Sequence, residues 1–98
     1  MKVKKRDGRI VDFNEQKIIR AILAAFESVD GEITQYAVDK AYNIASYVSG
    51  YFEEDETNPT PGIEEIQDVI EKGLMSTKRK DVAKAYILYR DRRTKERE

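Results

Sequence analysis

The sequence predicts an α+β fold that is mostly helical, a four-helix bundle capped by an N-terminal β-hairpin that forms a lid. Two observations carry this prediction. Asp7-Gly8 lies between two short alternating runs, which is a strong hairpin signal because Gly accepts the positive φ of a tight turn. Four later segments carry apolar residues at helical spacing. A chain of 98 residues with 40% hydrophobic content supports one domain with a modest core.

The hairpin is expected over residues 2–13, with strands at 2–6 and 9–13. Its basic residues are Lys2, Lys4, Lys5, Arg6 and Arg9. In a two-residue loop Arg6 would face Arg9, and like charges facing across a ladder are destabilising, which suggests an absent anion such as phosphate. The alternative is a solvated basic surface. Alternation puts Val3, Lys5 and Ile10 on one face and Arg6 on the other, so Val3 and Ile10 could form an apolar shelf. Lys5 and Arg6 could then share a phosphate only through a bulged turn or if Arg6 reached around.

The first two helices are expected over about 14–29 and 34–52. Asn14 is a good N-cap, and Gly31 suits the left-handed residue that ends a helix. The apolar stripes are Ile18, Ile22, Phe26 and Val29 in the first helix and Ala37, Ala41, Ile44, Val48 and Tyr51 in the second. Lys17 and Arg20 lie in the first two turns, where cations oppose the helix dipole, so together with the hairpin they favour an anion site.

The last two helices are expected over about 61–75 and 79–93. Thr60 fits an N-cap with Pro61 at the first helical position. The apolar stripes are Ile63, Ile66, Ile70 and Leu74 in the third helix and Val82, Ala85, Tyr86, Leu88 and Tyr89 in the fourth. The predicted domain therefore covers residues 1–93, and residues 94–98 form a charged tail, interpreted as a frayed helix end or a linker.

Composition excludes several classes of activity. With no Cys and no His, the chain lacks Cys/His zinc sites, disulfides, thiolate chemistry and triads with a His base. The acidic run at 53–56 is interpreted as solvated rather than as a metal site. We therefore expect no catalytic residue, no metal ligand and no enzyme activity. No apolar run approaches the ~18 residues that span a bilayer, and the charged start does not resemble a signal peptide. A cytoplasmic protein without membrane contact is expected.

Charge is distributed unevenly along the chain. The net charge is −1, but residues 1–20 carry +4, residues 21–77 carry −10 and residues 78–98 carry +5. If the fold brings the two ends together, they form one positive site. The overall acidity argues against nucleic acid as a partner.

Several of these pieces together resemble the ATP-cone domain. They are Lys5-Arg6-Asp7-Gly8-Arg9, Phe13-Asn14, Lys17-Ile18, Thr60 ahead of a helix, and the stretch from Val82 to Arg90. Such domains are found at the N-terminus of ribonucleotide reductases and in a related nucleotide-sensing repressor. The closing stretch looks most like the anaerobic reductases. One departure is Val11, which stands where some members carry an acid.

The resemblance implies an allosteric module that binds ATP or dATP between the lid and the bundle, with Mg accompanying the phosphates. It implies control of the activity and oligomeric state of a ribonucleotide reductase. The implied partners are the catalytic core, in cis or trans, and a second copy of the chain. The implied nucleotide-binding residues are Lys5, Arg6, Lys17 and Arg92 at the phosphates, Asn14 near the sugar and base, Val3 along the base, and Thr60 near the adenine.

Two other interpretations stay open. The acidic centre and the basic ends could pair between subunits in a protein-interaction or oligomerisation module that binds no nucleotide. The chain could also be the regulatory part of a nucleotide-sensing transcriptional repressor. Without Cys it is neither a whole repressor with its zinc ribbon nor a whole reductase with its cysteine radical.

Overall fold

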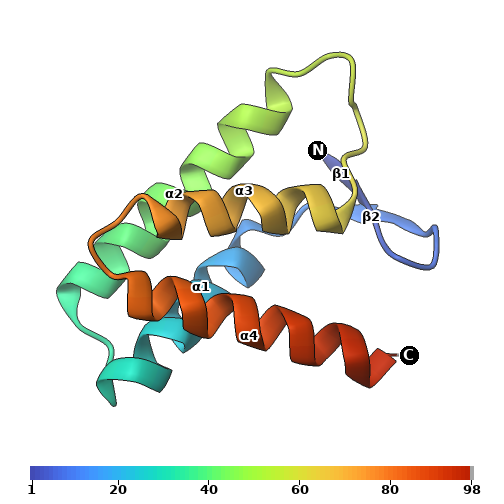
Figure 1. The fold of residues 1–98 in the computed structure, drawn as a ribbon. Coiled ribbons are helices and arrows are strands. Elements are labelled where there is room, and N and C mark those ends of the chain that lie inside the picture. Colours follow the sequence, from blue (N-terminus) through green and yellow to red (C-terminus); the bar gives the residue numbers. More distant parts are fainter. Residues whose placement is uncertain (98) are drawn as a thin grey trace.

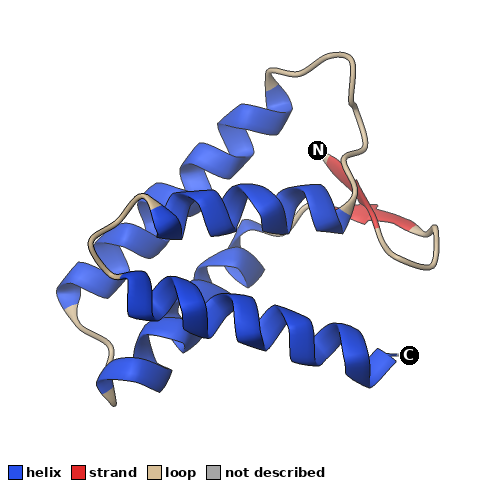
Figure 2. Cartoon of the chain, in the orientation of Figure 1, coloured by secondary structure: helices blue, strands red, loops and turns tan. Residues whose placement is uncertain are grey.

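The computed structural model describes residues 1–97 and confirms the predicted α+β class. The elements are β1 (Lys2–Lys4), β2 (Ile10–Asp12), α1 (Glu15–Asp30), α2 (Gln35–Glu53), α3 (Ile63–Met75) and α4 (Lys80–Arg97). Helix α1 packs against α2 and α4, and α3 packs against the same two helices. The helices thus form a bundle, and the hairpin lies at one end of it, beside the start of α3 (Figures 1 and 2).

The core is built from the predicted apolar stripes, with local exceptions. Phe26, Val48, Leu74 and Val82 are fully buried. Small residues of α2, namely Ala37, Ala41 and Ala45, are also buried and let neighbouring helices approach closely.

Four residues of the predicted stripes do not belong to the core: Val29, Tyr51, Leu88 and Tyr89 are exposed. In α2 the buried side continues at Phe52, which follows Ile44 and Val48 at the i+4 spacing of one helix face.

The ends of α1 are capped as the sequence predicts. The Asn14 side chain accepts a hydrogen bond from the Gln16 N–H at 3.0 Å. Gly31 adopts a φ of +75° and donates its N–H to the Glu27 carbonyl at 2.8 Å. Both caps are therefore confirmed.

The predicted N-cap at Thr60 was wrong. Helix α3 begins at Ile63, its N-cap is Gly62, and the Gly62 N–H donates to the Glu65 carboxylate at 2.7 Å. Pro61, the residue before this N-cap, is held outside the helix, because its carbonyl accepts a hydrogen bond from the Lys4 N–H of β1 at 3.0 Å. Lys4 and Gly62 also form a parallel bridge. The chain before α3 therefore runs extended beside β1 and ties the hairpin to the bundle.

The hairpin register also differs from the expected one. Lys4 pairs with Ile10, and the Lys5 N–H donates to the Arg9 carbonyl at 2.8 Å. The loop thus has three residues instead of two, so Lys5 rather than Arg6 faces Arg9. The cause is Gly8, whose φ of +89° closes a longer turn of the kind that favours glycine at its third position. The prediction that Val3 and Ile10 form an apolar shelf was wrong. Ile10 pairs with Lys4 rather than lying beside Val3, and its side chain is exposed.

Helix α4 continues beyond the predicted boundary at residue 93. Residues 94–97, which were expected to form a tail or linker, are helical, and Glu98 lies outside the described residues. The Thr94 hydroxyl donates to the Arg90 carbonyl at 3.0 Å within this extension. Among the described residues, no helix combines the length and the apolar character that crossing a membrane requires.

Candidate functional site

A basic cavity lies between the hairpin turn and the bundle. Its lining residues come from the turn (Lys5, Arg6), from α1 (Lys17, Arg20, Ala21, Ala24), from α3 (Ile63, Gln67) and from α4 (Tyr89, Arg90, Arg93). Its volume is about 550 Å³, within the range of roughly 300–1,000 Å³ typical of small-molecule sites. Six of the eleven lining residues are basic and none is acidic. We refer to it below as the basic cavity.

Local structure explains why these cations converge. The three-residue turn at Gly8 and the bridge from Lys4 to Gly62 hold the hairpin tip over the start of α3. Asn14 follows β2 closely and starts α1, which places Lys17 and Arg20 in its first turns. The C-terminal half of α4 lies at the same end of the molecule as the hairpin (Figure 1).

Arg90 is a largely enclosed cation of the basic cavity, with a side chain that is 15% exposed. It donates to Glu64 at 2.5 Å, to Glu71 at 2.7 Å and to Asp68 at 2.9 Å, all on α3. Burial lowers the pKa of the Arg90 guanidinium, but these hydrogen bonds outweigh burial and raise it above its ordinary value. Arg90 therefore acts first as a permanent charge that joins α4 to α3.

The other cations are less engaged. Arg6 pairs with Glu64, with Nη1 and Oε1 2.6 Å apart. Arg20 donates its Nε–H to the Gln16 carbonyl at 3.3 Å. Within residues 1–97, Lys5, Lys17, Arg20 and Arg93 form no salt bridge. Like charges gathered around one cavity repel one another, so a bound anion would stabilise this arrangement.

Gln67 adds a neutral feature to the basic cavity. Its side-chain oxygen Oε1 is buried and accepts no hydrogen bond from the part of the chain that the structure describes. An unsatisfied buried acceptor costs roughly 1–3 kcal/mol. A ligand that carries both anionic oxygens and an N–H or O–H donor would suit the basic cavity.

The structure brings together only some of the residues predicted from sequence. Lys5, Arg6 and Lys17 line the basic cavity. Val3 is buried in the core, the Asn14 oxygen caps α1, and Thr60 is half-buried in the loop before α3. None of those three lines the basic cavity, and their nucleotide-binding roles stay predictions.

Arg92 also lies outside the basic cavity. It lines a neighbouring cavity between α1 and α4 that is about 480 Å³ in volume, and its guanidinium carbon lies 5.8 Å from the Tyr89 ring centroid. Sequence reasoning missed Arg90, Arg93 and Gln67. A signal for the two arginines was present, because they continue the buried stripe of Val82 and Tyr86 at i+4 and i+3 steps.

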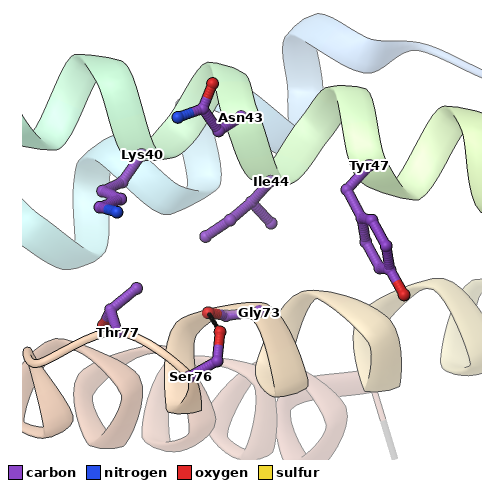
Figure 3. A pocket seen from close by; sticks show the side chains of 7 residues that line it. All are labelled: Lys40, Asn43, Ile44, Tyr47, Gly73, Ser76 and Thr77. Atoms are coloured by element: carbon purple, nitrogen blue, oxygen red, sulfur yellow. Dashed lines mark hydrogen bonds between the residues drawn. The ribbon is translucent and has the colours of Figure 1, made fainter.

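A different hollow lies between α2 and α3 and serves as a contrast. It is lined by Lys40, Asn43, Ile44, Tyr47, Gly73, Ser76 and Thr77, and its volume is about 350 Å³ (Figure 3). Lys40 is its only charged lining residue. This hollow lacks the concentration of positive charge that a polyanion requires.

Comparison with known proteins gives a consistent result along the whole chain. Residues 1–95 match the profile of the ATP cone domain family. A vitamin B12-dependent ribonucleoside-diphosphate reductase of Thermoplasma acidophilum is 41% identical over 101 residues, which cover 98% of this chain. The ribonucleoside-diphosphate reductase subunit alpha of Treponema pallidum is 37% identical over 99% of this chain.

A third relative is the anaerobic ribonucleoside-triphosphate reductase of Escherichia coli, which is 36% identical over 98% of this chain. Identity does not set this anaerobic enzyme apart from the other two. The chain spans 12% of the length of each of these three relatives.

Proposed function

The chain belongs to the ATP-cone domain family, and on that premise we propose that it binds ATP or dATP with the phosphates in the basic cavity. The observation that carries this proposal is the convergence of six basic side chains from three parts of the chain on one cavity without a lining acid. A nucleoside triphosphate supplies several negative charges within a few ångströms, which is the complement of this arrangement.

We assign the phosphates to Lys5, Arg6 and Lys17, with Arg20 and Arg93 as further contacts. Arginine and lysine form charge-assisted hydrogen bonds with phosphate oxygens, which are about twice as strong as neutral ones. The Gln67 oxygen is available to a donor on the nucleoside. Mg²⁺ would accompany the phosphates. Among residues 1–97, no three His, Cys, Asp or Glu side chains are grouped so as to hold a metal ion.

The biological role that we propose is allosteric control of a ribonucleotide reductase. The relatives are reductases by name, and the matching segment is a small part of each. Nucleotide in the basic cavity would change the contacts of the hairpin, α1 and α4 with the catalytic core or with a second copy. Activity and oligomeric state of the reductase would then follow nucleotide occupancy.

Titration calorimetry with ATP and dATP tests nucleotide binding directly. Binding should also raise the melting temperature, because ligand at 100 times its Kd stabilises the fold by about 2.7 kcal/mol. Lys17→Ala should weaken ATP binding about tenfold, which is the loss of one charged hydrogen bond of about 1.4 kcal/mol. Lys40→Ala is the matched control, because Lys40 lines the hollow between α2 and α3.

Two results would refute the proposal. One is the absence of heat and of a melting shift with millimolar ATP or dATP and magnesium in a folded protein. The other is an equal loss of affinity in Lys17→Ala and Lys40→Ala, which would mean that binding follows overall charge rather than the basic cavity.

A further inference from the structure

Glu64 lies between two arginines of the basic cavity. Its Oε1 is 2.6 Å from Arg6 Nη1 on the hairpin turn, and its Oε2 is 2.5 Å from Arg90 Nη2 on α4. The carboxylate thus joins three elements, the turn, α3 and α4, through one side chain. Its position in the first turn of α3 also suits an acid, because helix starts favour negative charge.

We propose that Glu64 is an internal competitor for the nucleotide phosphates, and that a phosphate binds Arg6 by displacing this carboxylate. The inference rests on the proposed function, since it concerns the same cavity. A carboxylate and a phosphate oxygen make the same kind of charge-assisted hydrogen bond with a guanidinium. The particular N–H of Arg6 that Glu64 accepts cannot also donate at full strength to a phosphate oxygen.

The contacts around Glu64 make this exchange feasible. Arg90 keeps Asp68 and Glu71 as partners when Glu64 leaves, so α4 stays joined to α3. Arg6 has no other salt bridge within the described residues, so its guanidinium becomes available. The Glu64 side chain is 49% exposed, and water can therefore solvate the released carboxylate.

The exchange would also change how the hairpin turn is connected to α3 when a nucleotide binds. Glu64 connects Arg6 of the turn to the first turn of α3. Phosphate binding would replace this side-chain connection with one that runs from the turn to the ligand. The backbone bridge between Lys4 and Gly62 would remain and keep the hairpin in place.

Calorimetry of Glu64→Gln against wild type tests the exchange, with ATP, inorganic tripolyphosphate and adenosine as probes. Loss of a half-exposed ion pair should tighten ATP and tripolyphosphate about threefold to fivefold. Adenosine, which has no phosphate, should bind equally to both proteins. Asp68→Asn is the matched control, because Asp68 is exposed on the same helix and pairs with Arg90 but not with Arg6. It should change affinity by less than twofold.

A double variant isolates the arginine involved. In an Arg6→Gln background, the gain from Glu64→Gln should disappear. If Glu64→Gln loses helical circular dichroism, Glu64→Asp replaces it, since Asp keeps the charge at the start of α3 but cannot reach both arginines. A smaller gain of about twofold is then expected.

Several outcomes would overturn the inference while leaving nucleotide binding intact. They are unchanged or weaker ATP binding by a folded Glu64→Gln, an equal gain in Asp68→Asn, and a gain that persists without Arg6. Failure of the wild-type protein to bind ATP would instead overturn the proposed function, so the two failures are distinguishable.

Discussion

Substitution of Gly8 by Ala tests whether the hairpin turn positions the cations of the basic cavity. Gly8 has a φ of +89°, and a Cβ added there would meet no atom within 4 Å. The cost therefore comes from the backbone alone and amounts to about 1 kcal/mol for a non-glycine residue in the left-handed region. In a domain of this size, that cost lowers the melting temperature by about 4–8 °C.

Gly31 provides the matched control. Its φ is +75° and its surroundings are equally open, so Gly31→Ala should destabilise the fold by a similar amount. It ends α1, however, and lies away from the lining of the basic cavity. Relaxation of the strained turn in Gly8→Ala would instead move Lys5 and Arg6. ATP affinity should fall about fivefold in Gly8→Ala and stay unchanged in Gly31→Ala.

Thermal unfolding and calorimetry on both variants give the result. Equal ATP affinity in the two variants would refute the positioning role of the turn. An unchanged melting temperature in Gly8→Ala would refute the left-handed conformation itself. Gly8→Asn should recover part of the lost stability, because Asn tolerates this region better than Ala.

Three further predictions concern the charges of α1 and α4. Arg90→Met should lower the free energy of unfolding by about 2–4 kcal/mol in urea denaturation, because it leaves Asp68 and Glu71 without their cation and Glu64 with Arg6 alone; a loss below ~0.5 kcal/mol would contradict its structural role. Arg93→Ala should weaken ATP about fivefold in calorimetry and Arg92→Ala should not, because only Arg93 lines the basic cavity; the reverse order would restore the sequence-based assignment of Arg92. Hydrogen bonds from Arg79 lower the carboxyl pKa of Asp30 below its ordinary value of 3.8. The folded state therefore gains stability above that pH and loses it as the pH falls through the lowered pKa. Between pH 6 and pH 2, the melting temperature of Asp30→Asn should fall less steeply than that of the wild-type protein. Identical slopes for the two proteins would exclude a contribution of the Asp30–Arg79 pair.

The helices could be predicted from the sequence because their information is local. Apolar spacing, Asn14 and Gly31 depend on residues within one or two turns of one another, and the structure confirms them. The start of α3 could not be predicted in this way. Whether Thr60 caps a helix depends on the hydrogen bond between Lys4 and Pro61, which joins residues far apart in the sequence.

The candidate site was predictable in its charge and only partly in its residues. Lys5, Arg6 and Lys17 lie on the first two elements, where the hairpin and α1 are adjacent in sequence and in space. Arg93 was missed because the end of α4 has no apolar periodicity of its own. Only extension of the helical register from Val82 shows which of its arginines faces the bundle.

The uneven charge of the chain is explained by the way the fold combines its parts. The basic N-terminal and C-terminal segments converge on the basic cavity, as the charge distribution predicted. Three acids of the acidic centre form ion pairs with one of these cations within the same molecule, because Glu64, Asp68 and Glu71 all pair with Arg90. An intersubunit pairing that used these three acids would have to break their contacts with Arg90 first. Nucleotide binding requires no such loss at Lys5, Lys17 or Arg93, and in the exchange that we propose a phosphate displaces an internal acid only at Arg6. The charge pattern of this chain therefore favours a site for a small anionic ligand over a charged interface between subunits.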